Sequence, residues 1–178
     1  MTIEINQLMY NKHNTIHEAL FILHEINPDI ILGGSLILSE LNLINRPVKD
    51  IDIIFYDNYK YNSFTAHLSN DSRFIEDEET SFRNDNCNNI NKISGYKYND
   101  SVNVDIILLP KNNSIKLCEI TLYNRKFLHQ PVSVIIKAKQ DLVKKNKHKL
   151  DLDYILSNYN PNYNVIINNP ILDDDLPF

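Results

Sequence analysis

The segment that decides the fold is Ile30–Phe55, which reads IILGGSLILSELNLINRPVKDIDIIF. It places two of the chain's three glycines, Gly33 and Gly34, between a short apolar run and a helical pattern. A chain with so few glycines uses a pair where a side chain would obstruct, as where a backbone approaches a phosphate group. Farther on, Asp50 and Asp52 alternate with β-branched residues, a composition typical of a central strand. The segment therefore predicts a strand, a glycine turn, a helix and a second strand, in that order.

Hydrophobic spacing predicts the other elements of the chain. Helices are expected at residues 15–26, 35–43 and 59–68, from 131 to about 145, and at 150–158. Strands are expected at residues 29–32, 51–55, 73–75, 93–98 and 102–109, with a hairpin turn at 99–101 and further strands and a loop within 115–127. This order predicts an α/β domain with a mixed β-sheet, flanking helices and C-terminal helices.

Composition limits the class of protein. The chain has 178 residues, of which 43% are hydrophobic, enough for the core of one domain. Its net charge of −5 disfavours broad nucleic-acid binding, although the lysine-rich segment 137–149 offers a local basic patch. Cys87 and Cys118 lack metal-ligand spacing and suit a reducing compartment. With no secretory leader and no apolar run of membrane-spanning length, we expect a soluble, cytoplasmic (intracellular) protein with no membrane partner.

Asp50 and Asp52 are candidate metal ligands. Residues two apart on a strand share a face, so the two carboxylates point the same way and repel each other unless a cation lies between them. A pair of Mg²⁺ ions fits, because Mg²⁺ prefers carboxylates together with substrate phosphates. The alternative is that Asp50 caps a turn and Asp52 is a solvated carboxylate at a sheet edge.

A third candidate, Asp105, interrupts an apolar strand. Asn103 and Ile107 share its face, whereas Val104 and Ile106 occupy the other. An aspartate among β-branched residues costs free energy unless it is paired or binds a metal. Beside the strand that carries Asp50 and Asp52, it is expected to share a metal and to take a proton from an attacking hydroxyl group. The alternative is a solvent-facing position on a half-exposed strand.

The glycine pair and Ser35 form the candidate phosphate site. Ahead of a helix, the glycines let backbone amides face a triphosphate, and the helix dipole favours negative charge there. Adjacent glycines also occur in simple tight turns. Ser35 has two interpretations: it contacts a phosphate oxygen, or it is the N-cap of the helix.

The chain resembles the DNA polymerase β-like nucleotidyltransferase superfamily in three elements. In sequence order, these elements are Gly33–Ser35, the stretch Arg46–Asp52 and the strand residue Asp105. The resemblance covers roughly Asp29–Asp153 and implies a nucleotidyltransferase-like sheet. It also implies that the Gly-Ser element opens a helix below the triphosphate. The two carboxylates of the second strand are then expected to bind both metals, and the third strand carboxylate to complete the site.

The stretch Pro47–Asp52 is also similar to the tRNA CCA-adding and poly(A) polymerase branch of that superfamily. Those enzymes are much longer and carry extra helical domains, for which this chain has no room. The compact architecture is nearer to the minimal and antibiotic-modifying nucleotidyltransferases.

The C-terminal helices add basic residues. Lys139 falls on the apolar stripe of its helix, and an inward lysine needs an anion, either a triphosphate or an aspartate at the edge of the core. The alternative is that its side chain extends outward to solvent. Lys147 and His148, followed by Asp151, resemble a Lys-[His/Asp]-x-x-Asp element that small family members place after this helix. The resemblance implies that Lys147 and His148 help to bind the nucleotide or the acceptor, and that Asp151 is structural. The alternative for His148 is a surface or packing position.

Together, these features predict a metal-dependent nucleotidyltransferase that transfers NMP from an NTP, such as ATP, to a hydroxyl acceptor and releases pyrophosphate. The expected catalytic and metal-binding residues are Asp50, Asp52 and Asp105, with Mg²⁺ or Mn²⁺ as cofactor. The expected nucleotide-binding residues are Gly33, Gly34, Ser35, Lys139, Lys147 and His148.

The sequence leaves the acceptor open among an RNA 3′ end such as that of tRNA, a small hydroxylated molecule and a protein hydroxyl. The alternative function is a catalytically inactive nucleotide-binding or interaction module of the same fold. We expect a catalytic core at residues 1–130, helices packed on it at residues 131–158, and an extended tail at residues 159–178.

Overall fold

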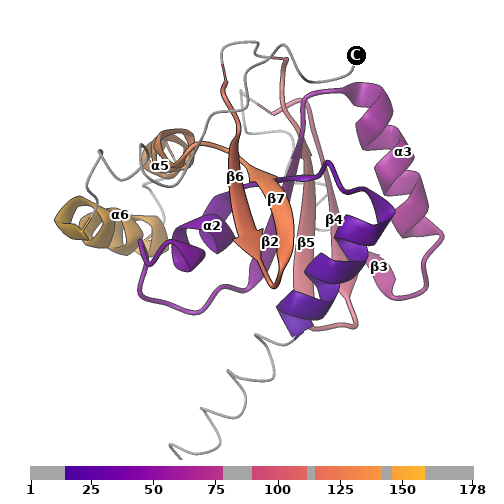
Figure 1. The fold of residues 1–178 in the computed structure, drawn as a ribbon, viewed down its shortest axis with the longest axis horizontal. Coiled ribbons are helices and arrows are strands. Elements are labelled where there is room, and N and C mark those ends of the chain that lie inside the picture. Colours follow the sequence, from indigo (N-terminus) through magenta and orange to yellow (C-terminus); the bar gives the residue numbers. More distant parts are fainter. Residues whose placement is uncertain (1–14, 78–89, 112–114, 142–145, 159–178) are drawn as a thin grey trace, which may run out of the picture. The chain divides into compact units, whose positions relative to one another are not determined.

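The structure, a computed structural model, describes residues 15–77, 90–111, 115–141 and 146–158 (Figure 1). The chain divides into two compact units, and each is treated by itself. The first unit is drawn from residues 1–30 and 49–112, and the second from residues 31–48 and 113–178. The three predicted carboxylates therefore belong to the first unit, whereas the predicted phosphate-binding residues belong to the second.

The first unit is built on four strands. Its elements are the helix at residues 15–26, β2 (Asp50–Phe55), α3 (Asn58–Ser69), β3 (Phe74–Asp77), β4 (Lys92–Tyr98) and β5 (Val102–Leu108). β5 pairs in parallel with β2 and antiparallel with β4, and β4 pairs antiparallel with β3. The strand order in this unit is therefore β3-β4-β5-β2, and its sheet is mixed.

Most of the buried apolar side chains of these strands lie on one face of the sheet. Ile51, Ile53 and Val104 are completely buried. α3 covers this face and contacts β2, β3 and β5, with the rings of Phe55 and Phe64 at a centroid distance of 5.3 Å. Because side chains alternate along a strand, the residues in between lie on the opposite face. That opposite face carries the predicted carboxylates.

The second unit combines short strands with helices. Its elements are β1 (Ile31–Leu32), α2 (Gly34–Glu40), β6 (Cys118–Leu122), β7 (Arg125–His129), α5 (Val132–Asp141) and α6 (Asn146–Asn158). β7 lies between β1, its parallel neighbour, and β6, its antiparallel neighbour. α5 contacts both α2 and α6 (Figure 1). Apolar side chains on the three helices, among them Ile37, Ile135 and Ile155, are buried in the core of this unit.

The predicted α/β class, with mixed strand pairing, flanking helices and C-terminal helices, is confirmed. The hairpin turn also lies where the sequence placed it. Asn99 and Asp100 both have positive φ, and the Ser101 N–H donates a hydrogen bond to the Tyr98 carbonyl at 3.0 Å. This geometry is that of a type I′ turn.

The N-cap prediction for Ser35 is wrong. α2 begins at Gly34, and its N-cap is Gly33, which has an extended backbone and makes no side-chain hydrogen bond. Gly34 adopts φ 62°, a left-handed conformation that suits glycine, and this turns the chain into the helix one residue earlier than predicted. The hydroxyl of Ser35 therefore lies inside the first turn and is used elsewhere.

Several predictions fall on residues outside the described ranges: the end of the penultimate helix at 142–145, Cys87 and the tail at 159–178. α6 begins at Asn146, four residues before the predicted start at Leu150. The predicted domain boundaries stay predictions.

In the part of the chain that the structure describes, every helix is too short or too polar to cross a lipid bilayer.

Candidate functional site

The parallel pairing of β2 with β5 brings the predicted carboxylates onto one face of the first unit. Asp52 lies directly opposite Asp105, and Asp50 lies directly opposite Asn103. Paired residues on adjacent strands share a face, and the strands are about 4.8 Å apart. The predicted placement of Asp105, beside the strand of Asp50 and Asp52 and on the same face as those carboxylates, is confirmed.

These carboxylates are presented to solvent by a rigid support. Asp50, Asp52 and Asp105 are all partly exposed. On the other face of the sheet, α3 is fastened to β4 by a hydrogen bond of 2.6 Å between Tyr61 Oη and Ser94 Oγ. The buried face therefore fixes the strands, and the three carboxylates lie on the face away from α3. Such a concentration of charge favours the binding of a cation.

Asp52 and Asp105 are the carboxylates best placed to share a divalent cation, because they occupy paired positions on adjacent strands. Asp50 instead accepts a hydrogen bond from Asn103 Nδ2 at 3.4 Å. Within the described ranges, no three Asp, Glu, His or Cys side chains are close enough to hold one metal ion. The donor atoms suit Mg²⁺ or Mn²⁺, and a third protein ligand would come from Asp50 if it turned from Asn103 toward the pair.

The predicted phosphate loop lies in the second unit, between β1 and α2. Gly33 is extended, with φ −135° and ψ −164°, and Gly34 follows in the left-handed region. α2 has only seven residues, so its dipole is too weak to define an anion site by itself. Any affinity of this loop for phosphate must come from neighbouring side chains of the unit.

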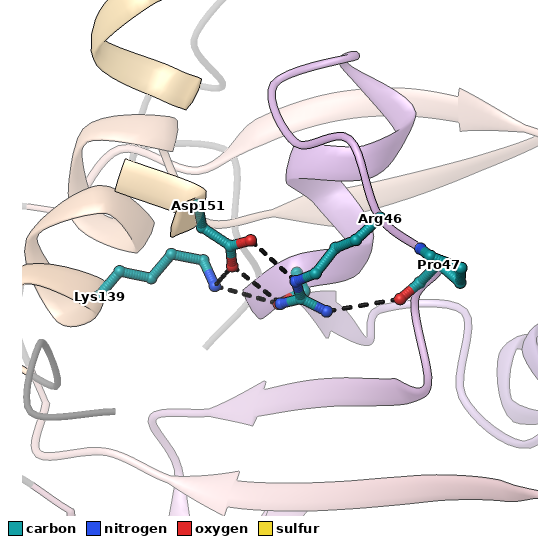
Figure 2. Close-up of polar contacts among 5 residues, drawn as sticks. Arg46, Pro47, Lys139 and Asp151 are labelled. Carbon is teal, nitrogen blue, oxygen red and sulfur yellow. Dashed lines mark hydrogen bonds and ion pairs between the residues drawn. The ribbon is translucent and has the colours of Figure 1, made fainter. Parts of the chain in front are cut away.

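Those side chains form a polar cluster of Ser35, Arg46, Lys139 and Asp151, here named the Asp151 cluster (Figure 2). Lys139 Nζ donates to Asp151 Oδ2 at 2.8 Å and to Ser35 Oγ at 3.1 Å. The guanidinium of Arg46 donates to Asp151 through Nε and Nη2, both at 2.8 Å, and Nη2 also donates to Ser35 Oγ at 3.0 Å. Both cations therefore share one carboxylate and one hydroxyl group.

The Asp151 cluster lies largely inside the unit. The side chains of Lys139 and Asp151 are 6% and 3% exposed, and that of Arg46 is 29% exposed. Burial by itself raises the pKa of the Asp151 carboxyl, but the hydrogen bonds from Arg46 and Lys139 outweigh it and hold the pKa below its ordinary value. Both cations and the carboxylate therefore meet beside the Ser35 hydroxyl.

The sequence identified part of this cluster. Lys139 faces inward, as its place on the apolar stripe predicted, and its anion in the structure is Asp151. Sequence reasoning did not identify Arg46 as a partner of Asp151, from which it is separated by 105 positions. His148 is buried, at 8% exposure, and the side chain of Lys147 lies outside the described part of the structure.

No family of known proteins matches the sequence, and no curated protein matches it. The structure is similar to the crystal structure of a protein from Thermotoga maritima that is described as a "putative nucleotidyltransferase". The two share 13% sequence identity and superpose with a TM-score of 0.53 over 80% of this chain and 93% of the other. The fold is nucleotidyltransferase-like. At this identity the likeness concerns the fold alone.

Proposed function

We propose that the chain is a metal-dependent nucleotidyltransferase, which transfers NMP from an NTP to an acceptor hydroxyl group and releases pyrophosphate. The observation that carries this proposal is the paired position of Asp52 and Asp105 on β2 and β5, with Asp50 on the same face. The nucleotidyltransferase-like fold supports it. Three partly exposed carboxylates on one rigid face suit a reaction in which metal ions neutralise phosphate oxygens.

In this proposal, Asp50, Asp52 and Asp105 hold Mg²⁺ or Mn²⁺. When bound, the metal ions stabilise the charge on the attacking and leaving oxygen atoms. Asp105 also takes the proton of the acceptor hydroxyl group, a task that suits a carboxylate exposed to the substrate. The completely buried Ile51 and Ile53 alternate with the two aspartates of β2 and hold their spacing fixed.

We assign the triphosphate to residues of the second unit: Gly33, Gly34, Ser35 and Lys139, with Lys147 and His148 as further nucleotide ligands. The two cations of the Asp151 cluster support this assignment, because charge-assisted hydrogen bonds from arginine and lysine suit phosphate oxygens. Ser35 Oγ accepts hydrogen bonds from both Arg46 and Lys139. The hydroxyl group of Ser35 therefore lies where the two cations converge.

The acceptor is a hydroxyl group of an RNA 3′ end such as that of tRNA, of a small molecule or of a protein. The lysine-rich segment 137–149 favours RNA, since lysines attract a phosphate backbone. The net charge of −5 favours a small cationic acceptor.

The second candidate function is a catalytically inactive nucleotide-binding or interaction module of the same fold. The hydrogen bond from Asn103 to Asp50 favours it, because it already engages one of the three carboxylates that the metal ions need. Such a module would bind NTP without transferring NMP.

Transfer of label from each α-³²P NTP tests the proposal. The purified chain is incubated with Mg²⁺ or Mn²⁺ and a whole-cell extract, which is then separated into RNA, protein and small molecules. We expect label in one fraction, lost with Asp105→Asn and retained with Asp153→Asn, an exposed aspartate on α6 that serves as the matched control. Label in no fraction, together with measurable NTP binding, would instead indicate the inactive module.

A further inference from the structure

α6 presents a group of exposed apolar side chains on its outward face. Leu150 is 70% exposed, Tyr154 is 36% exposed and Leu156 is 76% exposed. Among the described residues, these three make up half of the large apolar side chains that are exposed. The opposite face of the same helix carries Asp151 and Ile155, which are buried in the second unit. Single exposed apolar residues are ordinary on a protein surface, whereas a group of them on one short helix indicates an interaction surface.

Two opposite charges lie beside these apolar residues. Residues four apart are neighbours on a helix surface, so Leu150 and Tyr154 form one stripe, and Lys149 and Asp153 form the adjacent stripe. Both charged residues are exposed, and within the described ranges neither takes part in an ion pair. A lysine that precedes an aspartate by four positions has the less favourable order for a pair within one helix. Both charges can therefore serve a partner molecule, and these four residues are here named the Leu150 face.

The Leu150 face is complementary to a second copy of itself. In two antiparallel helices related by a twofold axis, residues that lie equally far from the axis in opposite directions along the helix meet each other. An axis at residue 152 sets Leu150 against the partner's Tyr154, and an axis at residue 151 sets Lys149 against the partner's Asp153. These positions differ by one residue, about 1.5 Å of helix rise, so a single axis serves both contacts. The symmetry also brings each flank of the helix against the same flank of its partner, so the two charged stripes meet.

We propose that the Leu150 face is the interface of a homodimer, in which the α6 helices of two copies pack antiparallel. Each copy then contributes the same patch, so every apolar contact and every ion pair occurs twice. A parallel arrangement would set Lys149 against the partner's Lys149, and like charges in contact oppose association. The proposal does not depend on the proposed function, because none of the four residues belongs to the candidate site.

The interface is expected to be weak. The 13 residues of α6 span about 20 Å. Two such helices bury less surface than a stable interface, which covers about 1,600 Å². The apolar stripe supplies the attraction, and the charged stripe at the rim supplies the orientation. We therefore expect a reversible dimer whose population depends on the protein concentration.

Dimer formation should also stabilise the Asp151 cluster. Asp151 projects from the inward face of α6 to Lys139 and Arg46, so the helix would be held between its own unit and the partner. A partner that binds only the folded chain stabilises it by mass action, so Tm should rise with protein concentration. Below about 1 µM the chain is expected to be monomeric, and there Asp153→Asn is a neutral substitution.

Sedimentation equilibrium of the full chain between about 1 µM and 1 mM tests the proposal. Lys149→Asp and Asp153→Lys each create like charges at both symmetric contacts. A mixture of these two variants restores opposite charges at both contacts, but only between one copy of each. Leu150→Gln removes the apolar contact and keeps a good helix former. The control is Lys60→Asp, which makes the same change of net charge as Lys149→Asp on the exposed surface of α3.

We expect the wild type and Lys60→Asp to dimerise with similar Kd values. Lys149→Asp, Asp153→Lys and Leu150→Gln should each raise the dimer Kd at least about tenfold, with Tm values near that of the dilute wild type. The equimolar mixture of the two charge variants should associate with a Kd within about threefold of the wild-type value.

A wild-type chain that stays monomeric would overturn the proposal, in favour of another occupant of the face, such as the apolar residues of the segment 159–178. A dimer that Leu150→Gln leaves intact would overturn it as well, because the copies would then meet through another surface. Folded charge variants whose mixture does not associate would also overturn it, since the antiparallel pairing of Lys149 with Asp153 would be wrong.

Discussion

Lys139 Nζ donates a hydrogen bond to Asp151 Oδ2 at 2.8 Å, and both side chains are almost completely buried. A buried ammonium group needs a negative partner, because its desolvation costs several kcal/mol, comparable to the whole stability of a domain. Asp151 supplies that charge to Lys139 and to Arg46 at once. A single carboxylate thus connects α5, α6 and the segment that follows α2.

Asp151→Asn should destabilise the chain strongly. The substitution keeps the shape of the side chain but leaves Lys139 buried without a counter-charge. Breaking a buried pair in this way costs about 3–5 kcal/mol, and the partial exposure of Arg46 places the expected loss near the lower figure. Urea unfolding measures this loss, with Asp153→Asn on the exposed side of α6 as the control. A loss of under about 1 kcal/mol would show that solvent screens the pair.

Stability should also fall in acid because of the same carboxyl group. The pKa of Asp151 is lower in the folded chain than its ordinary value of 3.8, so in acid the unfolded chain binds more protons than the folded chain. The stabilisation is complete above the unfolded pKa and is lost as the pH falls through the folded pKa.

Urea midpoints measured from neutral pH to about pH 3 check this dependence. Wild type should lose stability steeply below about pH 4, whereas Asp151→Asn, which starts lower, should have a shallower acid limb. Parallel curves for the two proteins would mean that other carboxyl groups control acid unfolding.

Lys139→Met separates the two roles of this lysine. Methionine keeps much of the apolar stem and removes the charge, so a triphosphate ligand would be lost without creating a large cavity. If Lys139 binds the triphosphate, the Kd for NTP should rise about tenfold, equivalent to about 1.4 kcal/mol. Calorimetric titration of the folded variant measures it, and Lys137→Ala, an exposed lysine on α5, is the control. Unchanged affinity would leave Lys139 as the partner of Asp151 only.

Asp52→Asn should abolish NMP transfer and leave the fold intact. The side chain is partly exposed and packs little, so the free energy of unfolding should change by no more than about 0.5 kcal/mol. The loss of transfer follows because the amide that replaces the carboxylate removes a charged metal ligand opposite Asp105. Label transfer and thermal unfolding are measured on one preparation. An unfolded variant would identify Asp52 as a structural residue.

The carboxylate face was predictable because strand alternation has a strict period of two. The buried Val104 and Ile106 on either side of Asp105 are sufficient to place that aspartate on the opposite face. The register that sets Asp52 opposite Asp105 depends on the pairing of two distant strands, for which local sequence gives no rule.

The second unit was less predictable. The period of α5 predicted an inward Lys139, whereas the bond from Arg46 to Asp151 depends on how α6 packs on the segment after α2. The β6–β7 hairpin was predicted only as strands and a loop. Its turn residues, Tyr123 and Asn124, both have positive φ, and tyrosine carries no turn signal.

The other hairpin offers a test of turn chemistry. Asp100 is exposed and has φ 54°, a left-handed conformation that costs a non-glycine residue about 1 kcal/mol. Asp100→Gly creates Asn-Gly, the pair most favoured in a type I′ turn. Glycine also raises the conformational entropy of the unfolded chain, which offsets part of the gain. The net stabilisation should be roughly 0.5 kcal/mol. Asp100→Ala removes the same charge without relieving the backbone, so it should destabilise the chain in the same urea titration. If both variants shift the midpoint equally, charge rather than φ governs this turn.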